Sequence, residues 1–468
     1  MAINSNSVDM VNGPLWNKIL RFTVAYMLTA MLQQLYSAAD VMVVGRFAGK
    51  EALAGVGTCT VLVNLFLNFI MGLAAGVTIV IGQEIGKSQE NEKHEGVSQA
   101  AHTTIALAIY CGLAITVVCL FFSSSLLNLI SVPEDVMSEA KIYLRVMSLG
   151  YVPSLVYNFG AGIMRAKGDA KRPLYIVLVS GGMKVVLNLL FVCVFKMTAS
   201  GVAAATIITQ AFNAVVVIYF LCNENDGTRI NLKKIRVYKK PLLRILKLGI
   251  PSGVQSAVYS VSNIMVQSSV NSFGSTAIAG SAACSSITEL YSVMCNSIYQ
   301  SSIVFISQNF GAKKFDRIKR IFNICVIYTV VIWVLQSLTT YLFGRNLIGL
   351  YATDPKVIEM AMRKFNILGY SYGLLGIGYV LSGVLRGMGA SIINMISSII
   401  GACGIRIVWI MTAFKSMKTF ESLCLCYPLS WLGVMILHAI MVLIVFRNAK
   451  REYLQPEKTG HKNCVSSY

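Results

Sequence analysis

The chain has 468 residues, of which 56% are hydrophobic and only 13% are charged, and its mean hydropathy is +0.66. Soluble proteins carry about 25% charged residues, so this composition excludes a string of soluble domains and indicates a protein that crosses a membrane many times. The net charge of +20 does not imply a nucleic-acid partner, because the basic residues lie at the ends of apolar segments, where they meet anionic lipid headgroups.

The apolar runs predict an all-α membrane protein. A transmembrane helix needs about 20 apolar residues, and the runs are long and lack the two-residue alternation of barrel strands. In chain order we predict twelve spans, at 19–45, 52–82, 98–123, 137–164, 174–196, 200–222, 245–272, 276–307, 321–343, 358–385, 391–414 and 420–446.

The basic residues between these spans predict the orientation. With the N-terminus inside, the inside segments hold 27 Lys and Arg and the outside segments hold 11, while the remaining two of the 40, Lys184 and Arg406, fall within spans. Cytoplasmic segments carry an excess of Lys and Arg. Both termini are therefore expected to be cytoplasmic.

The chain also repeats itself. Residues 47–57 (FAGKEALAGVG) match 273–282 (FGSTAIAGSA) at an offset of 225, and 83–86 (QEIG) match 308–311 (QNFG) at the same offset. A third match, of GIMRAKG with GVLRGMG, has an offset of 221. Six helices per repeat make two parallel lobes, which is a transporter plan. The predicted parts are lobes at 13–222 and 245–446, a cytoplasmic linker at 223–244 and a tail at 447–468.

These motifs resemble the bacterial multidrug and toxic compound extrusion (MATE) family. The resemblance rests on GPLWNKIL, LQQLYSAADVMVVGRFAGKEALAGVG, YNFGAGIMRAKGDAKRPL, QNFGAKKFDRIKR and VLRGMGAS, and runs from about residue 13 to 450. It implies a two-lobed antiporter of the cytoplasmic membrane that exports organic compounds in exchange for protons or sodium. We expect a small organic substrate and the lipid bilayer as partners, no nucleic acid, no cofactor besides the coupling ion, and a monomer.

Four ionisable residues lie deep within predicted spans: Asp40, Lys184, Glu289 and Arg406. A charge at the membrane centre costs roughly 3 kcal/mol, and buried charges persist when they are paired. Each lobe holds one acid and one base, so we predict two pairs, Asp40 with Lys184 and Glu289 with Arg406. Either pair could be a static strut. Two histidines in spans, His102 and His438, are expected to be structural.

The resemblance implies a coupling role for the helix-1 aspartate, with polar residues of helices 4, 5 and 6 around it. The matching residues are Asp40, Asn158, Lys184, Asn188 and Thr206. Lys184 departs from the family, since many members have asparagine there. Its ammonium would take the place of a bound cation, so protons are favoured over sodium as the coupling ion.

The second lobe is expected to lack the carboxylate sodium site of some relatives, because residues 245–273 and 360–386 contain neither Asp nor Glu. A polar cleft is predicted there from Gln255, Asn263, Gln267, Glu289 and Arg406. Pro153, Pro251 and Pro428 should bend their helices. Tyr26 stands where relatives commonly have proline.

Two other functions remain open. A flippase or exporter of a lipid-linked precursor or an endogenous metabolite would share the two-lobed plan, but would need a basic central cavity. Each deep base has an acid available in its own lobe, so we expect a cavity that is not strongly positive. A non-transporting scaffold is disfavoured by the repeat and the intramembrane charges. No nucleophile with an adjacent base, no metal set and no Walker loop is found in the sequence, so we expect neither an enzyme nor direct use of ATP.

Overall fold

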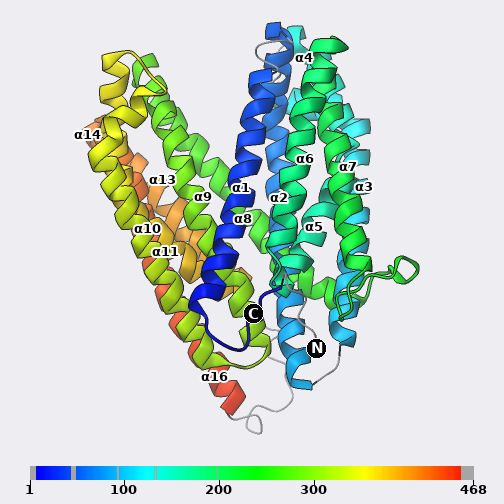
Figure 1. The fold of residues 1–468 in the computed structure, drawn as a ribbon. Coiled ribbons are helices and arrows are strands. Elements are labelled where there is room, and N and C mark those ends of the chain that lie inside the picture. The colour runs from blue at the N-terminus through cyan, green and yellow to red at the C-terminus, as the bar shows by residue number, and fades with distance from the viewer. Residues whose placement is uncertain are drawn as a thin grey trace. The chain divides into compact units, whose positions relative to one another are not determined.

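The structure is a computed structural model. It describes residues 7–43, 49–91, 94–130, 132, 134–197 and 199–454. Most of these residues are helical, and no strand is found among them (Figure 1). They divide into two compact units. Unit 1 contains the described residues up to Asp9 and those from Val24 to Gly249, and unit 2 contains Met10–Thr23 and the described residues from Ile250 onward.

Unit 1 is built from the first helices of the chain. They are most of α1 (Trp16–Val43), α2 (Gly49–Asn91), α3 (Glu95–Leu129), α4 (Glu134–Ser148), α5 (Tyr151–Lys167), α6 (Lys171–Leu189) with its π-helical end η2 (Leu190–Val194), α7 (Ala199–Cys222), the 3-10 turn η3 (Leu232–Lys234) and the start of α8 (Lys239–Asn271). The predicted span 137–164 is divided between α4 and α5, because a turn at Leu149–Gly150 interrupts the helix just before Pro153.

Unit 2 contains the start of α1, the rest of α8 with Pro251 inside it, and the helices that follow. They are α9 (Ser275–Gly311), α10 (Phe315–Gly349), α11 (Pro355–Gly387), α12 (Ser391–Ser398), η4 (Ile399–Gly404), α13 (Ile405–Trp409), η5 (Ile410–Phe414), α14 (Lys415–Met417), α15 (Phe420–Cys424) and α16 (Cys426–Leu454). The predicted span 391–414 was expected to be one regular helix. Instead, the run from α12 to α14 alternates α-helical and π-helical turns.

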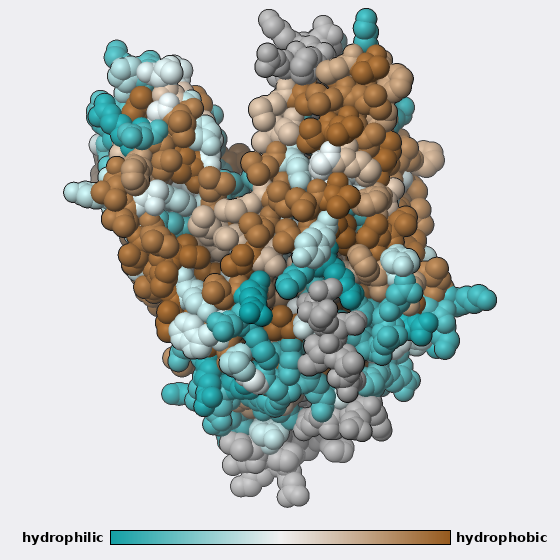
Figure 2. All heavy atoms as spheres, in the orientation of Figure 1, coloured by the Kyte–Doolittle hydropathy of each residue, from teal (hydrophilic) through white to brown (hydrophobic). Residues whose placement is uncertain are grey.

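Eight helical segments among the described residues are long and apolar enough to cross a membrane, judged by length and composition. The predicted spans 19–45, 137–164, 245–272 and 276–307 are not among them. Serine, asparagine and glutamine lower the hydropathy of α8 and α9, and residues 44 and 45 of the first span lie outside the described part. On the face drawn in Figure 2, hydrophobic residues cover the middle of the helices and hydrophilic residues gather at one end. A total of twelve crossings stays a prediction.

The unit boundaries differ from the lobe boundaries predicted at 13–222 and 245–446. The first turns of α1 pack in unit 2, where Thr23 Oγ1 donates to Ser301 Oγ at 2.8 Å and the Phe22 ring meets the Phe305 ring edge-on at 5.8 Å. The start of α8 packs in unit 1 instead. A Cβ on Gly76 of α2 would lie 2.7 Å from the Ile245 carbonyl oxygen, so this close crossing requires glycine.

Candidate functional site

In unit 1 the structure brings Asp40 of α1 together with two residues of α6. Lys184 Nζ donates to Asp40 Oδ2 at 2.6 Å, and Asn188 Nδ2 donates to Asp40 Oδ1 at 2.7 Å. The side chains of Asp40 and Lys184 are 21% and 18% exposed. Both carboxylate oxygens therefore have a donor, one charged and one neutral, and the predicted contact of Asp40 with Lys184 is present.

A glycine contact brings α1 and α6 close enough for this pair. The Tyr36 ring packs against Gly181, where an added Cβ would lie 1.6 Å from a ring carbon, and the Tyr36 hydroxyl is 3.4 Å from the Leu178 carbonyl oxygen. Asp40 comes four residues after Tyr36 and Lys184 three after Gly181, and these spacings place each pair on one helix face. The Tyr36–Gly181 contact thus sets the register in which Asp40 meets Lys184.

The other two unit 1 residues predicted for this site are Asn158 and Thr206. Each donates a hydrogen bond to the backbone of its own helix. Asn158 Nδ2 donates to the Ser154 carbonyl oxygen at 2.8 Å, and Thr206 Oγ1 donates to the Val202 carbonyl oxygen at 2.9 Å. Tyr26 packs under the Arg165 guanidinium, whose Cζ lies 5.6 Å from the ring centroid, and α1 is continuous from Trp16 to Val43.

In unit 2 the predicted pair of Glu289 with Arg406 is wrong. Arg406 is buried, and it donates from Nη1 to Asn263 Oδ1 at 2.8 Å and from Nε to Ser430 Oγ at 3.1 Å. Its guanidinium also stacks over Tyr427, with Cζ 4.8 Å from the ring centroid. Glu289 lies on the exposed side of α9 and makes no ion pair with a described residue. Neutral acceptors and an aromatic face satisfy this arginine instead of a carboxylate.

The predicted polar residues of α8 divide between the interior and the surface. Gln255 Oε1 is buried and accepts from Arg386 Nη2 at 2.7 Å and from Asn394 Nδ2 at 3.1 Å. Gln267 is exposed and donates to Asn271 Oδ1 at 3.0 Å. Arg386 directly follows the predicted span 358–385, and it is a buried partner of the predicted cleft residue Gln255.

Sequence reasoning missed a third buried cation of unit 2, Lys364. Lys364 stands near the start of the predicted span 358–385, but it is 4% exposed and donates to Ser281 Oγ at 2.6 Å and Ser285 Oγ at 3.3 Å. Its Nζ lies 5.8 Å from the centroid of the Tyr427 ring, the ring that Arg406 also faces. The sequence carries no local signal for this contact, because Ser281 and Ser285 precede Lys364 by 83 and 79 residues.

The two units therefore differ in charge. Unit 1 pairs its membrane carboxylate with a lysine, whereas Lys364, Arg386 and Arg406 of unit 2 are each at most 8% exposed and have neutral hydrogen-bond partners among the described residues. Removing a cation from water is costly without a counter-charge. Unit 2 thus holds three buried cations without an ion-pair partner among the described residues. In the described part of the chain, no three His, Cys, Asp or Glu side chains lie close enough to hold a metal ion.

The two histidines of the predicted spans, His102 and His438, have hydrogen-bond partners in the fold. His438 is buried between Ser398 Oγ at 3.1 Å and the Gly378 carbonyl oxygen at 3.3 Å. His102 contacts the Ser98 carbonyl oxygen at 2.8 Å through Nδ1, and its Nε2 accepts from the Asn231 backbone N–H at 3.0 Å. His102 thereby fastens the segment after α7 to α3.

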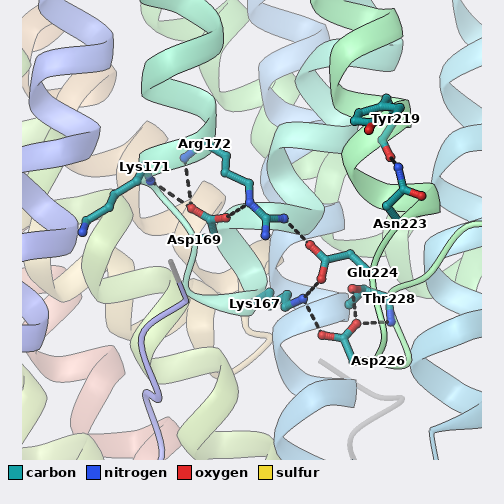
Figure 3. A network of polar contacts seen from close by, with 9 residues as sticks. All are labelled: Lys167, Asp169, Lys171, Arg172, Tyr219, Asn223, Glu224, Asp226 and Thr228. Carbon is teal, nitrogen blue, oxygen red and sulfur yellow. Dashed lines mark hydrogen bonds and ion pairs between the residues drawn. The ribbon is translucent and has the colours of Figure 1, made fainter. Parts of the chain in front are cut away.

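An ion-pair network fastens the same segment to the end of α5 and the start of α6 (Figure 3). Lys167 contacts both Glu224 and Asp226, while Arg172 contacts Glu224 and lies 3.2 Å from Asp169.

Burial alone would raise the pKa of Asp226, but hydrogen bonds from Lys167 and Thr228 lower it below its ordinary value. Burial raises the pKa of Asp169 despite backbone hydrogen bonds and the nearby Arg172. The predicted linker is therefore a docked element of unit 1.

Comparison with known protein families matches two separate stretches of the chain. A family model described as MatE matches the chain twice, over residues 25–190 and 251–412. The chain is similar to the probable multidrug resistance protein YoeA of Bacillus subtilis (strain 168), with 25% identity over 441 residues and 92% of each chain covered. The multidrug export protein MepA of Staphylococcus aureus (strain N315) is 23% identical over 425 residues, which is 88% of this chain and 92% of MepA.

Solved structures resemble the chain over nearly its whole length. One, described as the outward-facing conformation of a multidrug resistance MATE family transporter of the MOP superfamily, has a TM-score of 0.86 at 20% identity and covers 96% of this chain and 100% of its own. A MOP superfamily transporter from Pyrococcus furiosus has a TM-score of 0.81 at 21% identity, with 98% and 100% covered. At these identities the likeness establishes the fold.

Proposed function

Because the chain belongs to the multidrug and toxic compound extrusion (MATE) family, whose model matches most of it, we propose that it is a secondary active antiporter of the bacterial cytoplasmic membrane. It exports amphipathic organic compounds, often cationic, by alternating access, as a monomer with twelve crossings in two lobes and both termini in the cytoplasm. The names of the similar B. subtilis and S. aureus proteins, multidrug resistance and multidrug export, support this choice of substrate.

Protons drive the cycle through Asp40, and the Lys184–Asp40 contact is the observation that carries this assignment. The ammonium 2.6 Å from Oδ2 stands where a coupling sodium ion would have to bind. A proton that neutralises the carboxylate removes the charge that holds Lys184, so the α1–α6 contact depends on which side supplies protons. A gradient can do work through a site that changes protonation as access alternates.

Efflux of a fluorescent organic cation from a pump-deficient bacterial host tests this assignment. The wild type is compared with Asp40→Asn, with the proton gradient intact or collapsed and with sodium present or absent. We expect export that needs both Asp40 and the proton gradient and ignores sodium. Glu289→Gln is the matched control, because it neutralises the exposed carboxylate of unit 2. Export that survives Asp40→Asn would make the Asp40–Lys184 pair a strut.

A second candidate is export or flipping of an anionic compound, such as a lipid-linked precursor or an endogenous metabolite. Such cargo needs a basic site, and Lys364, Arg386 and Arg406 provide three buried cations bonded to neutral partners. The similar P. furiosus transporter is described as having a binding pocket of reversed polarity. Competition of dye export by organic anions and by organic cations separates the two candidates, since anionic cargo predicts inhibition by the anions alone.

A further inference from the structure

A cavity of about 560 Å³ opens on unit 2, and none of the residues discussed so far lines it. Helices α10 and α16 form most of its wall, and one residue of α11 completes it. Part of the lining is apolar, including Phe322 of α10 and Leu443 and Phe446 of α16. The rest is basic and consists of Lys319, Arg447, Lys450 and Arg451. We call this cavity the α10–α16 groove.

No carboxylate among the described residues neutralises the charge of the four basic residues. None of them makes an ion pair with a carboxylate in the part of the chain that the structure describes. Asp316 and Glu452, the nearest acids in sequence, make no ion pair with them there. Lys319 Nζ instead lies 5.5 Å from the centroid of the Phe446 ring. The groove therefore concentrates positive charge beside an apolar wall.

The position of the groove along α16 matches a lipid better than a soluble anion. The helix belongs to an apolar segment long enough to cross a membrane, Phe420–Tyr453. Ile440, Leu443 and Ile444 are 46%, 59% and 47% exposed, as expected for side chains that face hydrocarbon. Arg447, Lys450 and Arg451 follow within two turns. The groove thus passes from the hydrocarbon depth to the headgroup depth, where basic residues attract anionic lipids.

We propose that the α10–α16 groove is a binding site for one anionic glycerophospholipid, with its phosphate among Lys319, Arg447, Lys450 and Arg451 and an acyl chain along Phe322, Leu443 and Phe446. The site is separate from the exported substrate and from the coupling residues. Phosphatidylglycerol satisfies both halves of the groove, while phosphatidylcholine supplies the chains without net charge and inorganic phosphate supplies charge without chains.

Native mass spectrometry of the full-length protein in detergent, titrated with each of these three compounds, tests the proposal. We expect phosphatidylglycerol to bind on the order of twentyfold more tightly than phosphatidylcholine, since two basic residues that contact its phosphate contribute about fivefold each. The double variant Lys319→Gln/Arg447→Gln should lose most of that preference, while Arg447→Lys should keep it. Thermal unfolding without lipid checks that each variant remains folded.

The matched control is Lys233→Gln/Lys234→Gln, which removes the same charge from two exposed lysines of η3 in unit 1. It should keep the preference for phosphatidylglycerol within twofold. Equal binding of the two phospholipids by the wild type would overturn the proposal, and so would an equal loss in the control, which would indicate only a general surface charge. Displacement of the lipid by millimolar inorganic phosphate would also overturn it, because a free anion would then be the ligand.

Discussion

The membrane charges of unit 1 and unit 2 are stabilised in different ways. Asp40 in unit 1 is held by one cation and one amide, Lys184 and Asn188. Arg406 in unit 2 is held by an amide, a hydroxyl and an aromatic ring, while Glu289 stays exposed. One proton can neutralise the carboxylate of such a pair and end its attraction to the lysine, whereas an arginine keeps its charge at any physiological pH. The difference is consistent with our proposal of a proton-sensitive step in unit 1, and it leaves constant positive charge in unit 2.

The largest expected effect comes from breaking the unit 1 pair. Lys184→Met leaves Asp40 partly buried with only Asn188 as a donor, and we expect the free energy of unfolding to fall by about 2 kcal/mol, below the range for fully buried pairs because both side chains are about a fifth exposed. Asp40→Leu/Lys184→Met should regain most of that stability, yet neither variant should export. Thermal unfolding and dye efflux measure both quantities. A double variant as unstable as Lys184→Met would show that the lysine stabilises through other contacts.

Removing Arg406 from unit 2 should cost less, because it leaves neutral groups behind. Arg406→Met strands Asn263 and Ser430, and the expected loss is about 1.5 kcal/mol from hydrogen bonds to a charged group. The coupling of export to the proton gradient should be unchanged. A loss of proton dependence in this variant would move the coupling site into unit 2 and reverse the comparison.

The register of the unit 1 pair can be disturbed without touching a charge. Gly181→Ala forces the Tyr36 ring to move, with a cost of about 1 kcal/mol, and it should slow export by displacing Lys184 from Asp40. The companion change Tyr36→Ala makes room for the new methyl group and should restore part of the rate. A double-mutant cycle on efflux gives the coupling between the two positions. Strictly additive effects would show that this packing does not position the pair.

The smallest effect belongs to the exposed acid. Glu289→Gln should change the free energy of unfolding by less than about 0.5 kcal/mol, as is usual for a surface residue outside a network. Its dye efflux should stay close to that of the wild type. A larger destabilisation, measured by thermal unfolding, would mean that Glu289 balances the buried cations of unit 2 over a distance.

Much of the fold could be predicted from local sequence. Apolar runs indicate membrane helices because the bilayer requires hydrogen-bonded backbone and apolar surface, and the described residues are helical without strands. The pair of Asp40 with Lys184 followed from one acid and one base in the same lobe. That same reasoning failed for Glu289 and Arg406, because counting charges does not show which side of α9 an acid occupies.

The sequence by itself determined the membrane class, the family and the repeated motifs, since each depends on composition or on the order of residues along the chain. Only the tertiary structure decided that Lys364 and Arg386 are buried, that His102 fastens the linker, and that the first turns of α1 pack in unit 2. These facts depend on contacts between residues far apart in sequence, such as Thr23 with Ser301. A helix presents its side chains on all sides, and only its packing partners determine which side is buried.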